Sequence, residues 1–205
     1  LTLEPENTIK KKVYLVGGAV RDKLMNIKNS DLDYVAVGYK ESDFKHLEKV
    51  GKDFPIFLDE NGNELALARI ERKISKGYNG FSTETNNVTL EEDLSRRDLT
   101  INAMAYDENN NTLIDPFNGE EDINKRVLKH ISNAFIEDPL RVLRIARFRA
   151  KFGVTWKIHN STKVLIYNMR ESLNELQPDR VWKEIEKVLQ LENSHIFFET
   201  LLELG

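Results

Sequence analysis

The sequence contains no cysteine, so disulfide bonds and zinc sites built on thiolates are excluded. Its four histidines, His46, His130, His159 and His195, are scattered along the chain and show no metal-binding spacing. Any metal ion must therefore be held by oxygen ligands.

Long apolar runs are also missing, and none approaches the ~20 residues that a membrane-spanning helix needs. The first residues, LTLEPENTIKKK, lack the apolar segment of a signal peptide. We therefore expect a cytoplasmic protein with no membrane partner. Proline and glycine are scarce, at 5 and 10 of 205 residues, and with 40% apolar and 31% charged residues the composition predicts a folded chain.

Excess positive charge is absent as well, because the formal net charge is −4. This value alone argues weakly against a nucleic-acid partner, which requires basic surface. However, Arg141, Arg144, Arg147 and Arg149 fall within nine residues. A local basic surface is therefore expected in spite of the negative total.

The spacing of apolar residues divides the chain into two parts. The first part shows strand patterns at 13–16, 33–37, 54–58 and 64–70, a helix after Gly17, a helix over 43–50 capped by Ser42, an irregular loop over 75–87, and helical spacing over 90–106 before a turn at 113–119. Helical spacing alone follows at 137–153, 161–176, 178–191 and 194–204. We expect an α+β head (residues 1–136) followed by an all-helical neck (residues 137–205).

Two acids, Asp31 and Asp33, stand at the entrance of the apolar run DLDYVAVG. Alternation along a strand sends both side chains to the same face, about 7 Å apart. Such a pair suits Mg²⁺, which prefers a few carboxylates together with water and substrate phosphate oxygens. The alternative is that the two acids simply begin a strand or cap a turn.

The stretch VYLVGGAVRD places Gly17 and Gly18 between a strand and the start of a helix. Free backbone N–H groups at such a position can hold a phosphate. Arg21, one turn further, can add a charge-assisted bond to the same anion. Most glycine pairs are only tight turns, but one within sixteen residues of the paired acids favours a phosphate site.

The segment EDPLRVLRIARF combines Asp138, a helix N-cap candidate, with Pro139 in the first turn and arginines at 141, 144 and 147. At ~100° per residue, the three arginines lie within an arc of roughly 120°, opposite much of the apolar set. This pattern predicts either a binding surface or a solvated charged face.

Two acids and one charged pair add to these candidates. Glu64 opens the strand pattern ELALARIERK and is a candidate third catalytic carboxylate, with Glu71 as a weaker one, although a surface position beside a turn is an equal alternative. In RVWKE, Arg180 and Glu184 are spaced at i,i+4, which predicts a structural helix pair.

The combination LVGGAVRDKLM…SDLDYVAVG resembles the head of class II tRNA nucleotidyltransferases and bacterial poly(A) polymerases, which share a polymerase-β-like nucleotidyltransferase fold. Further blocks similar to that family follow in its order, from Val13 to Leu189: GKDFPIFL, ELALARIERK, GYNGF, EEDLSRRDLTINAMAYD, LIDPFNG, EDPLRVLRIARFRAKFG and RVWKEIEKVL. The resemblance therefore covers most of the chain.

The resemblance implies which residues would bind the metal ion and the triphosphate. Asp31 and Asp33 would bind Mg²⁺, and Gly17, Gly18 and Arg21 would receive the triphosphate.

It also implies how the rest of the nucleotide is bound. Arg97 of SRRDLTINA would contact the nucleotide, and Asp98 would orient that guanidinium or meet the ribose, unless the two form a buried structural pair. Asp138 and Arg141 would read the Watson–Crick edge of ATP or CTP. Arg144 and Arg147 would then serve phosphate or RNA.

The implied activity is template-independent, Mg²⁺-dependent addition of C, C and A to the 3′ end of tRNA from CTP and ATP. CC-only, A-only and poly(A) addition use nearly the same residues, but DYVAVG, GKDFPIFL and GYNGF resemble the tRNA branch more closely. Members of the family usually continue into further helical regions, so a nucleotide- or RNA-binding module without turnover is the alternative. A scaffold with an inactive site is disfavoured because every block keeps its charged residues.

Overall fold

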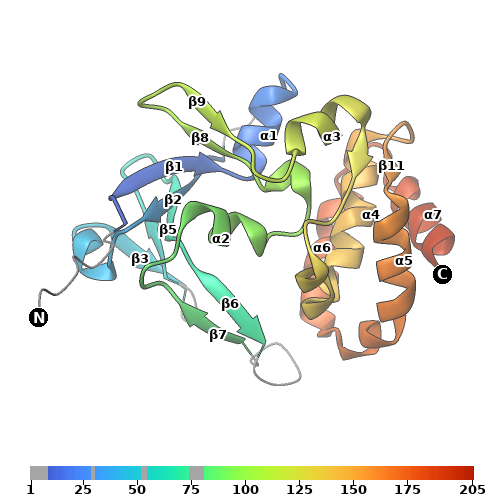
Figure 1. The fold of residues 1–205 in the computed structure, drawn as a ribbon. Coiled ribbons are helices and arrows are strands. Elements are labelled where there is room, and N and C mark those ends of the chain that lie inside the picture. Colours follow the sequence, from blue (N-terminus) through green and yellow to red (C-terminus); the bar gives the residue numbers. More distant parts are fainter. Residues whose placement is uncertain (1–8, 29–30, 52–54, 74–80) are drawn as a thin grey trace, which may run out of the picture.

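The structure is a computed structural model that describes residues 9–28, 31–51, 55–73 and 81–205, with the backbone alone at 71–73 and 81–82. An α+β part occupies the N-terminal side and a helical part the C-terminal side, as Figure 1 shows. The predicted fold class is therefore confirmed. None of the helices in the described residues combines the length and apolar character that crossing a bilayer requires.

A mixed sheet forms the centre of the α+β part. Its strands in the described residues are β1 (Lys12–Val16), β2 (Asp33–Val37), β3 (Glu48–Val50), β4 (Ile56–Leu58), β5 (Glu64–Leu67), β8 (Ala105–Asp107) and β9 (Thr112–Ile114). The order across the sheet is β3-β4-β5-β2-β1-β8-β9. Only the β2–β5 pair is parallel, and the other neighbours are antiparallel. Val35, Ala36 and Val37 of β2 are buried, which explains the continuous apolar run after the paired acids.

Short helices and two small ribbons complete this part. They are α1 (Gly18–Leu24), η1 (Glu41–Phe44), α2 (Leu90–Ser95), η2 (Thr100–Asn102), α3 (Gly119–Lys125), η3 (Asn133–Glu137), the antiparallel β6 (Ile70–Lys73) and β7 (Phe81–Glu84), and the parallel β10 (Val127–Leu128) and β11 (Lys157–Ile158). Local caps explain the helix starts. Thr89 and Glu92 form a capping box at α2, and Asp115 accepts hydrogen bonds from the N–H groups of Gly119 and Glu120 at α3.

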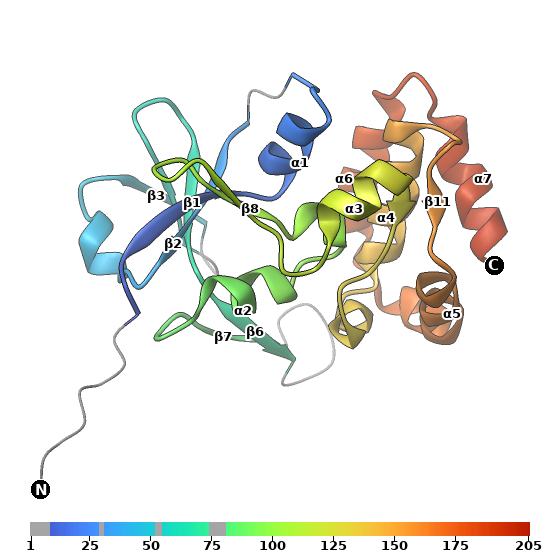
Figure 2. The same ribbon diagram turned by 45° about the horizontal axis from the view of Figure 1, so that its top comes forward.

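The C-terminal part consists of α4 (Leu140–Phe152), α5 (Asn160–Met169), η4 (Arg170–Glu175), α6 (Pro178–Leu189) and α7 (His195–Leu204). Helix α4 packs against both α6 and α7. Figures 1 and 2 show α7 on the side of α4 that faces away from the α+β part. Helix α4 is, with β11 and α5, one of the elements through which the two parts of the chain meet.

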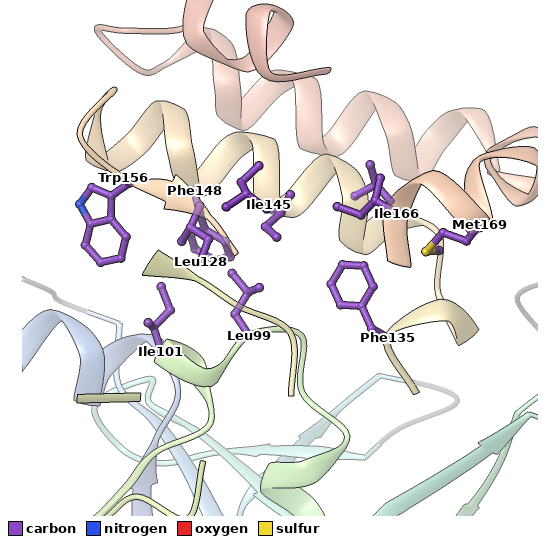
Figure 3. Packing of buried hydrophobic residues seen from close by; sticks show 11 residues of the cluster. Leu99, Ile101, Leu128, Phe135, Ile145, Phe148, Trp156, Ile166 and Met169 are labelled. Atoms are coloured by element: carbon purple, nitrogen blue, oxygen red, sulfur yellow. The ribbon is translucent and has the colours of Figure 1, made fainter. Parts of the chain in front are cut away.

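A single hydrophobic cluster joins the two parts, as Figure 3 shows. It combines residues before and after the expected boundary at 136/137: Leu99, Ile101, Leu128, Phe135, Val142, Ile145, Phe148, Trp156, Ile158, Ile166 and Met169. Each of these side chains is less than a tenth exposed. The division into head and neck stays a prediction about function, because the packing runs across it.

The predicted helix over 43–50 is wrong. The chain instead forms η1 around Ser42, which lies inside that turn and does not cap it, and then strand β3. Residues of β3 pair with β4, for example Lys49 with Phe57. Pairing with the sheet satisfies the backbone groups of this segment, whereas an isolated helix of two turns is below the length that overcomes the cost of nucleation.

Three other element predictions are corrected in part. Residues 81–84 of the predicted loop form β7, and 74–80 lie outside the described residues. The helical pattern over 90–106 ends with α2 at Ser95, because the chain must then reach β1, where β8 pairs Ala105 with Val16. The strand pattern over 64–70 is divided into β5 and β6, and β4 occupies only 56–58 of the pattern over 54–58, of which residue 54 is not described.

Candidate active site

A cavity of about 780 Å³ lies between the α+β part and the helices α4 and α6. Its described lining residues are Gly17, Gly18, Arg21, Asp22, Asp31, Asp33, Arg69, Arg96, Arg97, Asp98, Asn102, Asp138, Leu140, Arg141, Arg144, Arg147, Phe148, Lys151, Arg180 and Lys187. Basic side chains outnumber acidic ones two to one in this set, although the whole chain has a net charge of −4. The cavity therefore favours a large anionic ligand.

The cavity brings together nearly all the residues predicted for the site from the sequence. Those that line it are Gly17, Gly18, Arg21, Asp31, Asp33, Arg97, Asp98, Asp138, Arg141, Arg144 and Arg147. Glu64, the candidate third carboxylate, is not among the described lining residues. The side chain of Glu71 lies outside those described.

The glycine turn after β1 allows two guanidinium groups to approach the backbone closely. Gly17 has a φ of +67°, which favours glycine, and its N–H donates to the carbonyl of Met104 at 3.2 Å. A Cβ atom at Gly17 would lie 2.8 Å from Nη1 of Arg97, and one at Gly18 would lie 3.3 Å from Nη2 of Arg21. The missing side chains thus create the space beside both cations.

Two carboxylates face the same cavity at the start of β2. Asp33 is the first residue of the strand and Asp31 precedes it by two positions. Burial raises the pKa of Asp33, and the nearby charges of Glu64 and Asp31 raise it further, against the opposing charges of Arg97 and Arg21. Glu64 pairs with Asp33 in the parallel β2–β5 register and is exposed. Within the described part of the chain, no group of three or more His, Asp or Glu side chains is arranged to hold a metal ion alone.

Arg97 is held by an acid that the sequence reasoning missed. Asp93, a buried residue of α2, accepts hydrogen bonds from Nη2 of Arg97 at 3.2 Å and from Nη2 of Arg96 at 2.8 Å. Burial alone would raise the pKa of Asp93, but the two guanidinium groups outweigh burial and lower it. The i,i+4 and i,i+3 spacings in EDLSRR are the sequence signal for this arrangement. About a fifth of the Arg97 side chain is exposed where it lines the cavity, so part of its guanidinium can meet a ligand, while its Nε is buried and has no hydrogen-bond partner among the described residues.

Of the two roles expected for Asp98, the orientation of Arg97 is contradicted, whereas contact with the ribose stays a prediction. Asp98 is buried and accepts hydrogen bonds from Nε of Arg144 at 2.8 Å, from Nδ2 of Asn102 at 2.9 Å, and from the N–H of Leu99 at 2.8 Å. Burial alone would raise the pKa of Asp98, but the charge of Arg144 and the Asn102 bond hold it well below its usual range. Asp98 therefore stays ionised and fixes Arg144 of α4.

The beginning of α4 carries the second predicted pair, Asp138 and Arg141. Asp138 accepts a hydrogen bond from the N–H of Leu140 at 3.1 Å, in keeping with its predicted capping role. The guanidinium of Arg141 donates to the carbonyls of Ala134 at 2.9 Å and Arg96 at 2.6 Å. Both side chains are thus held at one end of the cavity.

The predicted pair between Arg180 and Glu184 of α6 is replaced by longer-range pairs. Arg180 donates to both carboxylate oxygens of Asp138, at 3.1 and 2.9 Å. Glu184 accepts from Nε of Arg147 at 2.5 Å and from Lys187 at 3.3 Å. Helix α6 is therefore connected through these pairs to Asp138 and to α4, and it adds Arg180 and Lys187 to the cavity lining.

Comparisons with known proteins agree with this geometry. A family model described as "Poly A polymerase head domain" matches residues 13–129, and one described as "Probable RNA and SrmB- binding site of polymerase A" matches residues 156–205. Among curated proteins, a multifunctional CCA protein of Pseudoalteromonas atlantica is 54% identical over 201 residues, with 95% of this chain and 49% of the relative covered. A CCA-adding enzyme of Blochmanniella floridana is 50% identical over 199 residues, with 95% and 48% covered.

Solved structures of CCA-adding enzymes also resemble this chain. A CCA-adding enzyme in apo form II has a TM-score of 0.79 at 30% identity, with 95% of this chain and 49% of that chain covered. The CCA-adding enzyme of Bacillus stearothermophilus in complex with CTP has a TM-score of 0.77 at 28% identity, with 94% and 48% covered. The chain thus spans about half the length of the relatives that it matches.

Proposed function

The chain belongs to the poly(A) polymerase head-domain family, and from this premise we propose that it carries the nucleotide-binding and catalytic part of a CCA-adding enzyme. The proposed reaction is the addition of C, C and A to the 3′ end of tRNA from CTP and ATP, with release of pyrophosphate. The observation that carries the proposal is one basic cavity that contains paired carboxylates, a glycine turn and the Asp138–Arg141 pair. The names of the relatives support the same reaction.

The phosphate end of the proposed nucleotide site lies beside Gly17. Arg97 is oriented by Asp93 and is about a fifth exposed where it lines the cavity, so the exposed part of its guanidinium can donate to a phosphate oxygen. The lack of a side chain at Gly17 and Gly18 lets the triphosphate approach the backbone N–H groups.

Asp31 and Asp33 fit a hard divalent cation. They are oxygen donors that line the cavity, and burial followed by the charges of nearby acids raises the pKa of Asp33, which is the situation that a cation relieves. Mg²⁺ held there would neutralise phosphate charge and favour attack of the RNA 3′-hydroxyl on the α-phosphorus. The two carboxylates would hold the metal, and phosphate oxygens of the substrate would complete its coordination.

The base end of the proposed site is formed by Asp138 and Arg141. A carboxylate and a guanidinium together offer acceptors and donors that can match the edge of cytosine or adenine. Arg180 fixes Asp138, and the carbonyls of Ala134 and Arg96 fix Arg141. Residues 1–136 would accordingly supply the phosphate end and residues 137–205 the base end, with Arg144 and Arg147 available to phosphate or RNA.

The proposal is tested by Asp31→Asn and Asp33→Asn, measured as extension of tRNA transcripts that end before CCA, in C, or in CC. Each variant should lose at least ~100-fold in incorporation rate, with an unchanged circular dichroism spectrum. Glu60→Gln, at an exposed turn, is the matched control and should keep full activity. Glu64→Gln should lose less activity than the aspartate variants do. The reason is that Glu64 affects the site only through its charge, which raises the pKa of Asp33.

The products distinguish the related activities. Stepwise addition of C, C and A that then stops supports the proposal, whereas a long ladder of A would assign poly(A) synthesis. Nucleotide binding by calorimetry without any extension would mean that the chain is a nucleotide-binding module. Full activity in both aspartate variants would disprove the role of the paired carboxylates.

A further inference from the structure

Arg21 is buried among protein groups, although it lines the cavity. Its side chain is only 4% exposed. Nε donates to Asp22 at 2.7 Å and Nη1 donates to Oδ1 of Asn102 at 2.5 Å. The guanidinium carbon lies 5.2 and 5.3 Å from the ring centroids of Phe148 and Phe152, which belong to α4. This residue of α1 therefore has its main contacts with α4 and η2.

The contacts of Arg21 continue as a chain of hydrogen bonds to a second point on α4. Asn102 accepts from Arg21 and donates to Asp98 at 2.9 Å, and Asp98 in turn accepts from Arg144. Asn102 and Asp98 are both buried. A substitution of Asn102 that removes either hydrogen bond would leave Arg21 or Asp98, both buried and charged, without one of its partners.

Asp22 adds a third connection between the same two helices. Its Oδ2 lies 3.4 Å from Nζ of Lys151, near the end of α4. The cavity-facing side of α4 is therefore attached at successive turns, through Arg144 to Asp98 just before η2, and through Phe148 and Lys151 to α1. These attachments fix how far α4 can slide along α1.

The position of α4 decides where the base would be read. Asp138 and Arg141 stand at the beginning of α4, whereas the glycine turn stands at the beginning of α1. The distance between the phosphate end and the base end of the cavity thus depends on the position of one helix against the other. Misplacement by about 1 Å is enough to cost ~100-fold in an enzyme rate.

We propose that Arg21 is a positioning residue that fixes α4 against the glycine turn and thereby sets base selectivity, and that it does not bind the triphosphate. The inference rests on the proposed nucleotide site. It changes the role expected from the sequence, in which Arg21 received the triphosphate. The planar guanidinium suits this role because its edge binds Asp22 and Asn102 while the phenyl rings pack against it.

The test is calorimetric titration of the 205-residue chain, with Mg²⁺ present, by pyrophosphate, CTP and UTP. Arg21→Met keeps the aliphatic part of the side chain and removes the guanidinium group. It should keep pyrophosphate affinity within ~2-fold and lower the CTP-to-UTP affinity ratio on the order of 10-fold. Arg21→Lys should restore little, because a single ammonium cannot reproduce the two directed bonds. Loss of pyrophosphate affinity with an unchanged ratio would overturn the proposal, because it would place Arg21 on the phosphate.

Two other variants keep the proposal testable if Arg21→Met does not fold. Phe152→Leu changes a ring that touches Arg21 and is not among the described cavity-lining residues, and Phe152→Ala removes that ring. Both should lower the CTP-to-UTP ratio and leave pyrophosphate affinity unchanged; an unchanged ratio in both would contradict the inference.

Arg149→Gln is the matched control. Arg149 is an arginine of α4 that pairs with Glu203 of α7 and is not among the described lining residues, so the ratio should not change. If the unmodified chain binds neither CTP nor pyrophosphate, the proposed function fails, and that result is distinct from failure of the positioning role.

Discussion

At the turn after β1, Gly17 leaves the space that the guanidinium of Arg97 occupies. We predict that Gly17→Ala strains the backbone at a φ of +67° and also displaces Arg97, whose Nη1 would lie 2.8 Å from the new Cβ. Nucleotide affinity should fall about 10-fold or more, because a charge-assisted bond is lost. Calorimetric titration with CTP or ATP measures this change.

Gly62→Ala is the control for strain alone. Gly62 has a φ of +81°, and a Cβ there would meet no atom within 4 Å. Both variants should lower the free energy of unfolding by about 1–2 kcal/mol, measured by urea unfolding. Equal nucleotide affinity in the two variants would show that Arg97 does not act at this turn.

Single residues show what local spacing can and cannot predict. The paired acids, the two glycines and the arginines of α4 were found from the sequence because each set lies within a few positions along the chain. The contacts of Asp98 with Arg144 and of Asp138 with Arg180 join residues 46 and 42 positions apart. Such pairs depend on how the helices pack, so the sequence predicted most of the residues that were expected to meet in one cavity but not their partners.

At the scale of elements, the bond between Asp98 and Arg144 connects α4 to the segment between α2 and η2. Because the folded pKa of Asp98 is lowered, its charged form stabilises the fold fully above the unfolded value of 3.8, and this contribution is lost as the pH falls towards the folded value. We predict that Asp98→Asn lowers the free energy of unfolding by roughly 3 kcal/mol at neutral pH, because Arg144 loses its partner.

The pH dependence provides the check on this prediction. The difference in unfolding free energy between the unmodified chain and Asp98→Asn should stay constant from about pH 7 to about pH 5 and shrink below about pH 4. Urea unfolding at each pH measures it. A difference that grows on acidification would contradict the assigned direction of the pKa change.

Apolar spacing predicted the long C-terminal helices and several short elements, whereas other short elements were missed. The four C-terminal helices and strands β1 and β2 follow directly from apolar spacing. Strand β3 was mistaken for a helix because its three residues carry no period of their own and depend on β4 for their hydrogen bonds. The short strands β8 and β9 likewise form where neighbouring strands supply their partners.

For the whole molecule, the shared core implies that the α+β part and the helices unfold together. Leu94 is fully buried in the cluster of the sheet and α2, while Trp156 is buried in the cluster that joins the two parts. We predict that Leu94→Ala lowers the free energy of unfolding by about 2–5 kcal/mol and shifts the transition of Trp156 fluorescence as much as that of circular dichroism.

The chain contains two tryptophans, so the experiment is made in a Trp182→Phe background. Trp182 is 55% exposed and contributes no core packing that this change removes. Val188→Ala, in the cluster between α4, α6 and α7, is the reciprocal variant and should shift both signals equally. Separate transitions would show that the two parts are independent.

The parallel register of β2 and β5 also restricts how the length of this protein can change. Asp33 stands opposite Glu64 and Tyr34 stands opposite Leu65, so the carboxylates share one face and the next residues point to the other. A shift by one position within either strand would exchange the two faces, placing acids in the core and apolar side chains in the cavity. A shift by two would keep the parity of the faces. Insertions in the turn around Gly62, outside the paired residues, leave this register unchanged and with it the side chains that line the cavity.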